Sequence, residues 1–135
     1  AATLLTSARE AAAERLTTSV MEELGPLKLE RARFRVAFEP VADGRRGPLG
    51  VETVRFEIAT NAGTDFGPLT KIASGGEMSR FTLALKVSLA RTGTAGTLIF
   101  DEIDRGVGGA TANAIGARLA RVAESGVGLA VEITR

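Results

Sequence analysis

A short apolar run without charge, residues 97–100, decides the fold class. It follows a glycine and is typical of a strand buried on both faces of a parallel sheet. A segment of helical periodicity comes next, with Ile115, Leu119 and Val122 on one face, and residues 127–134 form a second apolar run. Because strands that alternate with helices build parallel sheets, the sequence predicts an α/β fold around a buried parallel strand core.

The first 25 residues predict one helix. Apolar side chains recur every three or four positions from Leu5 to Leu24, with charged residues between them. Gly25 and Pro26 are expected to end this helix. Two interpretations remain, a surface helix packed on its own domain or the end of a longer coiled-coil arm. The window alone favours the surface helix, because a coiled coil requires heptads sustained over about three or four repeats.

Two later segments, residues 34–38 and 54–58, alternate between apolar and polar side chains. This period of two is that of half-buried strands, so the sequence predicts a β-hairpin. The connection, residues 40–50, is rich in glycine and proline and is expected to be an exposed tip. Arg45 and Arg46 on this tip could contact a phosphate backbone, although two arginines on a loop are more often simply solvated.

The segment Ser74-Gly75-Gly76-Glu77 stands directly before a long helical pattern. Its serine and glutamate predict a capping box, in which the two side chains satisfy free backbone amides at the start of the helix. The box does not account for the two glycines, since each costs up to about 1 kcal/mol relative to alanine within a helix. Bare backbone at a helix N-terminus favours the close approach of a phosphate. Such an interaction is worth about 0.3–1 kcal/mol, too little to hold a nucleotide alone.

Asp101 and Glu102 follow the apolar run directly. Open α/β sheets place their ligands at this carboxyl end of the strands. Two adjacent carboxylates repel each other unless a cation lies near, and Mg²⁺ chelated by nucleotide phosphates would supply one. Asp101 would then be its ligand, and Glu102 would polarise the attacking water. A bare acidic pair would favour a plainer interpretation, because strands often end in exposed acids.

Composition narrows the chemistry further. The chain has no cysteine and no histidine, which excludes disulfides, zinc-thiolate sites and imidazole catalysis. Seventeen basic and 16 acidic residues leave a net charge of +1, which argues against a chain-wide polyanion-binding surface. Tryptophan and tyrosine are absent, so stacking on single-stranded bases is not expected. No apolar run approaches the ~20 residues of a membrane span, and we expect a cytoplasmic protein without a membrane partner.

Four segments carry a resemblance to a known family: residues 61–63 (Asn-Ala-Gly), 69–80 (the signature and its flanks), 83–86 (Leu-Ala-Leu-Lys) and 99–104 (around the acidic pair). Their order of signature, helix, apolar strand, acidic pair and aspartate loop resembles the C-terminal lobe of ABC-type ATPase heads of the SMC-like class. Within that class, the four segments are similar to the RecN family of bacterial DNA-repair proteins. The resemblance covers nearly the whole chain.

The resemblance implies an ATPase head that is split along the sequence. An N-terminal lobe carries the Walker A P-loop, and a long antiparallel coiled coil leads from it to this lobe. Residues 1–25 would then be the end of the returning arm rather than a surface helix, and residues 26–135 would be the C-terminal lobe of the head. The family also implies a homodimer with ATP held between two heads, and DNA as a ligand of the complete protein at the nucleoid.

The resemblance also implies roles for the site residues. Four signature residues would bind, in trans, the nucleotide held by the partner head: Ser74, Gly75, Gly76 and Glu77. On the nucleotide of its own head, Asp101 would bind Mg²⁺ and Glu102 would be catalytic. Asp104 matches the D-loop, which communicates across the dimer.

The chain departs from the family pattern in two places. It has no Gly-Lys dipeptide and therefore no Walker A motif, so we expect ATPase activity from a complete head and none from this segment alone. In the family a switch histidine follows the last strand, whereas here Ile133 and Thr134 are followed by Arg135, so the histidine is absent or lies beyond residue 135. Glu132 also stands where an apolar residue is expected. Two alternatives to an ATPase head remain: an interaction module whose signature is only a helix cap, or a DNA-binding module that uses Arg45, Arg46 and the arginines of the first helix.

Overall fold

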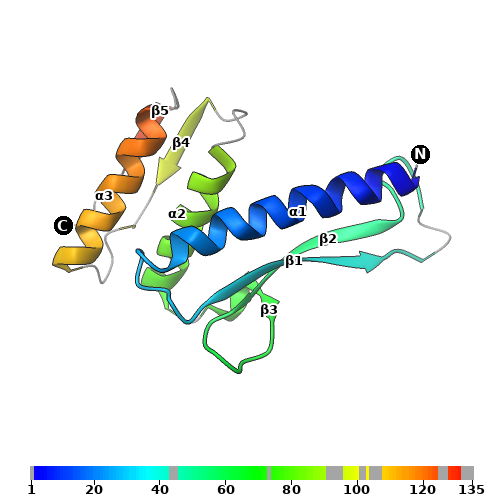
Figure 1. Cartoon of the computed structure of the whole chain (residues 1–135), viewed down its shortest axis with the longest axis horizontal. Coiled ribbons are helices and arrows are strands. Elements are labelled where there is room, and N and C mark those ends of the chain that lie inside the picture. The colour runs from blue at the N-terminus through cyan, green and yellow to red at the C-terminus, as the bar shows by residue number, and fades with distance from the viewer. Residues whose placement is uncertain are drawn as a thin grey trace.

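The computed structural model describes residues 2–42, 46–72, 74–90, 96–100, 103, 108–124 and 128–131. Figure 1 shows a long helix lying along a β-hairpin, with two further helices and a small parallel sheet grouped at one end. The described elements are α1 (Ala2–Leu24), β1 (Arg33–Pro40), β2 (Glu52–Ala59), β3 (Gly67–Pro68), the 3-10 helix η2 (Leu69–Lys71), α2 (Gly75–Ala90), β4 (Thr97–Phe100), α3 (Gly109–Glu124) and β5 (Gly128–Val131). The predicted α/β class is confirmed.

The predicted hairpin is present as β1 and β2, which pair antiparallel, and β3 adds a short third strand beside β2. The register places Phe34 opposite Ile58 and Val36 opposite Phe56, so these apolar side chains share one face. On the other face, Arg35 forms an ion pair with Glu57 at 2.7 Å. Cross-strand pairing therefore satisfies the charged face while the apolar face is free to enter the core.

The hairpin tip is tied to the first half of α1. Arg9 Nη2 donates a hydrogen bond to the carbonyl of Leu49 at 2.8 Å, and its Nη1 lies 3.7 Å from Glu52 Oε1. Gly50 has a φ of 98°, a conformation that favours glycine, and a Cβ built there would lie 2.8 Å from Arg9 Nη1, so a larger residue would also displace the end of the Arg9 side chain. Arg45 lies outside the described residues.

The helix α1 ends where the sequence predicts, but by a different residue. The last residue of the helix is Leu24, and the residue in the left-handed conformation that terminates the helix is Lys28, with φ 62°. The amide of Leu29 bonds to the carbonyl of Leu24 at 3.0 Å, and the amide of Lys28 bonds to that of Gly25 at 3.0 Å. This is a Schellman motif, in which Leu24 and Leu29 are both buried. Gly25 and Pro26 thus lie within the terminating turn instead of causing it.

Only the C-terminal end of α1 is buried. Val20 and Leu24 are fully covered, Leu5 and Leu16 are half-buried, and Ala12 is exposed. The apolar stripe seen in the sequence therefore packs on the core at the C-terminal end of the helix and lies outside the core at the N-terminal end. None of the described helices has the combination of length and apolar character that a membrane crossing requires.

Aromatic contacts join the hairpin to α2. The Phe34 ring lies 5.6 Å from the Phe56 ring and 5.7 Å from the Phe81 ring, measured between centroids. Edge and tilted geometries at these distances are favourable beyond the area they bury. Phe81 is 1% exposed, and the last turns of α1 pack onto the same cluster.

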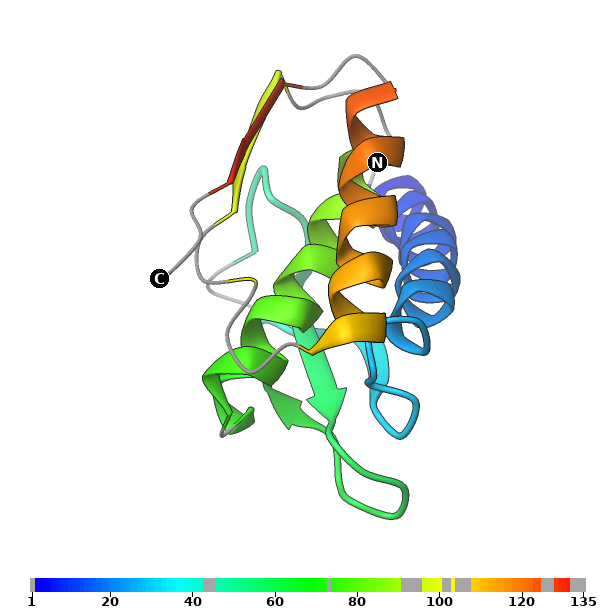
Figure 2. The ribbon, with the colours of Figure 1, turned by 90° about the vertical axis from the view of Figure 1, so that its left-hand side faces the viewer.

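The predicted parallel strands are confirmed as β4 and β5, joined by α3, with Thr97 opposite Gly128 and Phe100 opposite Val131. Figure 2 shows α2 and α3 on the same side of this pair. Leu98 and Phe100 point into the core, but Thr97 is exposed and Ile99 is 65% exposed. The expectation that the strand is buried on both faces is wrong for this chain, because the described helices cover one face only.

Replacing Phe81 with alanine is expected to destabilise the fold by about 3–5 kcal/mol, because the change removes a fully buried ring and leaves a cavity between α2 and the hairpin. Urea denaturation of the chain, followed by circular dichroism, measures the change. Leu49→Ala is the matched control, since Leu49 is 83% exposed and its loss should change the free energy of unfolding by less than about 0.5 kcal/mol. Equal effects of the two changes would contradict this assignment of the core.

Candidate functional site

The signature residues form the N-terminus of α2. Ser74 precedes the helix, and its Oγ accepts a hydrogen bond from the amide of Glu77 at 3.4 Å. The carbonyl of Ser74 accepts the first helical bond from the amide of Met78 at 2.9 Å. The serine half of the predicted capping box is thus present, although its bond is long. Ser74 and Gly75 are exposed, and Gly76 and Glu77 are half-buried, so the end of the helix is accessible from solvent.

The rest of α2 is anchored. Ile72, two residues before the cap, is buried in the core, and Phe81, Leu83 and Ala84 are buried along the helix. The short 3-10 helix η2 leads into this segment, with the amide of Ile72 bonded to the carbonyl of Leu69 at 3.1 Å. The exposed signature therefore stands on a rigid element, as binding groups that need precise placement usually do.

Lys86 connects α2 to the end of β4. Its Nζ donates a hydrogen bond to the carbonyl of Ile99, and it lies 5.0 Å from the centroid of the Phe100 ring. The sequence contained no signal for this contact, because a lysine on a helix ordinarily points into solvent. Lys86 thus joins the helix that begins at the signature to the strand that precedes the acidic pair.

The acidic pair Asp101 and Glu102 lies outside the described residues, as does Asp104. The residues beside the pair are described and buried: Phe100 is 1% exposed and Ile103 is 4% exposed. Within the ranges that the structure describes, no three acidic side chains gather as a metal site would require.

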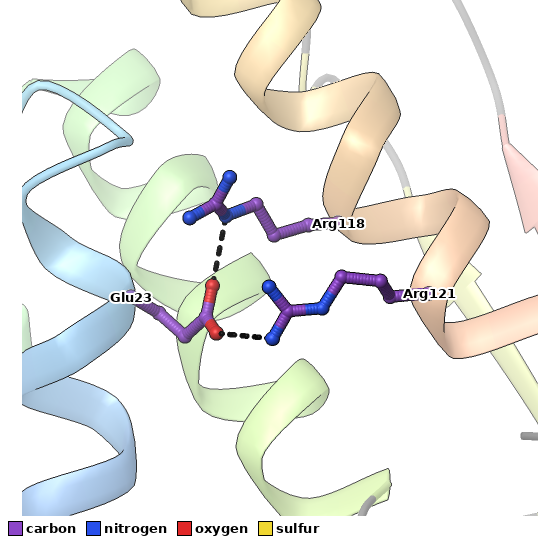
Figure 3. Close-up of polar contacts among 3 residues, drawn as sticks. All are labelled: Glu23, Arg118 and Arg121. Atoms are coloured by element: carbon purple, nitrogen blue, oxygen red, sulfur yellow. Dashed lines mark hydrogen bonds and ion pairs between the residues drawn. The ribbon is translucent and has the colours of Figure 1, made fainter.

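A buried charge cluster that the sequence did not reveal joins α1 to α3 (Figure 3). Glu23, in the last turn of α1, is 3% exposed. Its Oε2 accepts a hydrogen bond from Arg118 Nε at 2.9 Å, and its Oε1 lies 3.5 Å from Arg121 Nη2. A glutamate on a helix rich in charged residues is usually predicted to be exposed to solvent. The partners of Glu23 lie 95 and 98 residues away in the sequence, so no local pattern indicates them.

Comparison with known proteins identifies sequence relatives. No family model matches the chain. It is 47% identical over 120 residues to a DNA repair protein RecN of Treponema pallidum, and 43% identical over 131 residues to a DNA repair protein RecN of Streptomyces coelicolor. These alignments cover 86% and 90% of the chain, but only 21% and 23% of the two relatives. The chain thus spans about a fifth of the length of the curated relatives it matches.

Solved structures with a similar fold are heads of SMC proteins. An SMC head bound to the C-winged helix domain of ScpA superposes with a TM-score of 0.61 at 18% identity, over 93% of this chain and 36% of that one. An SMC head with an extended coiled coil from Pyrococcus furiosus gives a TM-score of 0.57 at 24% identity, over 90% of this chain and 28% of that one. At these identities the likeness concerns the fold. Sequence and fold therefore agree, and the chain is a RecN-like segment with the fold of the C-terminal lobe of an SMC-type head.

Proposed function

We propose that the chain is the C-terminal half of an ATP-binding and ATP-hydrolysing head of a RecN-like protein that acts in DNA double-strand-break repair and recombination. The observation that carries the proposal is the N-terminus of α2, where Ser74 and Gly75 are exposed on a buried helix. This arrangement occurs in a chain that is RecN-like over nine-tenths of its length. An exposed, rigidly held helix N-terminus next to small residues is suited to a phosphate group.

In this proposal residues 1–25 are the end of a coiled-coil arm, and residues 26–135 are the lobe itself. The burial of α1 supports the division, because its last turn is buried in the core, while its first half, which Arg9 ties to the hairpin tip, contains no buried residue. A groove of about 830 Å³ between α1 and the end of α2, lined among others by Leu16, Ser88 and Leu89, offers a second arm helix a place to pack.

The signature acts on a nucleotide held by a second head. Ser74 and the amides of Gly75 and Gly76 would donate hydrogen bonds to its terminal phosphate. Glu77, whose amide bonds to the Ser74 hydroxyl, would complete the signature. A helix end contributes about 0.3–1 kcal/mol to anion binding, whereas micromolar affinity requires about 8 kcal/mol. The signature is therefore suited to completing a site built elsewhere, which is what a homodimer with ATP between its heads requires.

The acidic pair acts on the nucleotide of its own head. Carboxylates are the hard oxygen ligands that Mg²⁺ prefers, so the donor set fits this cation, with Asp101 as the ligand. Mg²⁺ bound with ATP would neutralise charge on the phosphates. Glu102 would orient and polarise the attacking water, and Asp104 would contact the opposite head as the D-loop. Lys86 supports this geometry, because it fixes the Ile99 carbonyl two residues before the pair.

The P-loop of the proposed head would come from a second lobe of the same protein. An N-terminal lobe that carries Walker A would cover the open face of β4, where Ile99 is exposed. The complete protein would act on DNA in the cytoplasm, at the nucleoid. An apolar strand face left uncovered in one lobe is what a docking partner of this kind would use.

Ser74→Arg in a complete head, made by joining this chain to a P-loop lobe, is expected to abolish ATP-dependent dimerisation. The bulky cation would occupy the space of the phosphate on the partner head. Analytical ultracentrifugation with and without ATP measures the effect. Ser7→Arg is the control for the added cation, because Ser7 is an exposed serine on α1 and is not part of the signature. If Ser74→Arg dimerises normally and only lowers stability by ~1 kcal/mol, the signature is a helix cap and the chain is an interaction module.

Glu102→Gln in the same complete head is expected to lower hydrolysis by about 100-fold or more while preserving ATP binding, so that the ATP-bound dimer accumulates. The amide keeps the shape of the side chain but no longer polarises water as a carboxylate does. Phosphate release and the lifetime of the dimer measure the two effects. Glu124→Gln, an exposed glutamate at the end of α3, controls for the change of charge. Hydrolysis at the original rate would remove Glu102 from the catalytic role.

A further inference from the structure

We propose that Glu23, Arg118 and Arg121 form a charge clamp through which the arm helix α1 positions α3 for ATP hydrolysis, an inference that rests on the proposed function. Glu23 belongs to the last turn of α1, and both arginines belong to α3. The chain that leads back from the start of α3 carries the acidic pair. The three residues would thus be positioning residues, remote from the nucleotide itself.

The buried position of Glu23 is energetically unfavourable unless its carboxylate is paired with a positive charge. A carboxylate that is 3% exposed has lost its hydration, and burial of an unpaired charge costs several kcal/mol. It also stands at the C-terminal end of a helix, where the dipole disfavours negative charge. The last turn of α1 contains no basic residue. Both penalties are offset by α3, which supplies one guanidinium to each carboxylate oxygen.

The two arginines contribute unequally. The side chain of Arg118 is 15% exposed and its Nε lies 2.9 Å from Glu23 Oε2, so this pair is shielded from solvent. The side chain of Arg121 is 53% exposed and lies 3.5 Å from Oε1, at the rim of the cluster. Figure 3 shows both side chains reaching from α3 toward the same carboxylate. Shielded pairs are screened less by salt and lose more when one partner is removed.

The clamp adds a direct link between two helices that both pack on α2. The principal contacts of α1 are with α2 and β1, whereas those of α3 are with α2 and β5. Both helices also reach the hydrophobic core, α1 through Val20 and Leu24 and α3 through Ile115 and Val122. Loss of the clamp would therefore leave both helices on the core and loosen the position of α3 relative to α1. A helix of 23 residues is about 35 Å long, so a tilt of the arm at its far end reaches Glu23 as a small displacement.

The position of α3 matters because its N-terminus lies close in sequence to the acidic pair. The helix starts at Gly109, and Ile103, which lies between the acidic pair and this helix in the sequence, is buried. A misplacement of about 1 Å in a catalytic group can cost 100-fold in rate. The signature, by contrast, stands on α2, which carries none of the three clamp residues. The clamp should therefore affect hydrolysis and leave ATP-dependent dimerisation of the heads intact.

The test uses a complete head with its arm. Glu23→Gln and Arg118→Gln should each lower kcat by about tenfold or more, with the affinity of the dimer unchanged and the double variant no worse than either single one. Arg118→Lys keeps the positive charge and should retain most of the activity. Glu22→Gln is the matched control, because Glu22 is the exposed neighbour on the same helix turn. Unchanged kcat in Glu23→Gln, or kcat and dimerisation falling together, would overturn the clamp.

Two further measurements keep the outcome decisive. If Glu23→Gln does not fold, Arg121→Gln replaces it, since this half-exposed partner can be changed without burying a lone charge. It should lower kcat in the same direction by a smaller factor, and no change would overturn the proposal. Hydrogen exchange needs no activity: Glu23→Gln should speed the exchange of amides 109–116, while Glu22→Gln should not. A wild-type head that hydrolyses no ATP would refute the proposed function, and unchanged exchange would refute the clamp.

Discussion

The contact between Phe34 and Phe81 joins the hairpin to α2, and the remaining elements are placed around that junction. The Phe81 side of α2 receives the hairpin, and the last turns of α1 close over the same cluster through Val20 and Leu24. Ring pairs of this kind combine a large buried area with a preferred geometry, so they fix direction as well as stability. The hairpin and the arm helix consequently form one body with α2, and the exposed end of that helix inherits their rigidity.

Helix α2 carries three functionally distinct groups of residues along its length. Its N-terminus presents the signature, its middle carries Phe81, and its fourth turn holds Lys86 against the carbonyl of Ile99. A helix is stiff over this length, so a displacement of its N-terminus is carried to Lys86, whose side chain contacts the strand that precedes the acidic pair. In the proposed dimer, contact of the signature with the opposite nucleotide would be felt at the strand that serves the head's own nucleotide.

Much of the fold could be predicted from local patterns. The helix up to Leu24, the hairpin, the helix that starts after Ser74 and the parallel pair β4 and β5 all follow from periodicity and turn residues. The cap at Ser74 followed from its spacing to Glu77. The charge cluster around Glu23 and the contact of Lys86 could not be predicted, because each joins residues distant in sequence whose types are ordinarily solvated. The open face of β4 could not be predicted either, because an apolar strand does not show whether the element that covers it belongs to the same segment of chain.

That open face also bears on how the two lobes would find each other. The exposed side of β4 is small, with Ile99 as its one large apolar residue among those the structure describes, and so small a patch makes only a weak contact between separate molecules. Lobes carried on one polypeptide meet at an effective concentration that the connecting arm sets, which can reach the millimolar range for short linkers. The length and stiffness of the coiled coil would then determine what fraction of heads is assembled. The apolar contact between the two lobes would not need high affinity of its own.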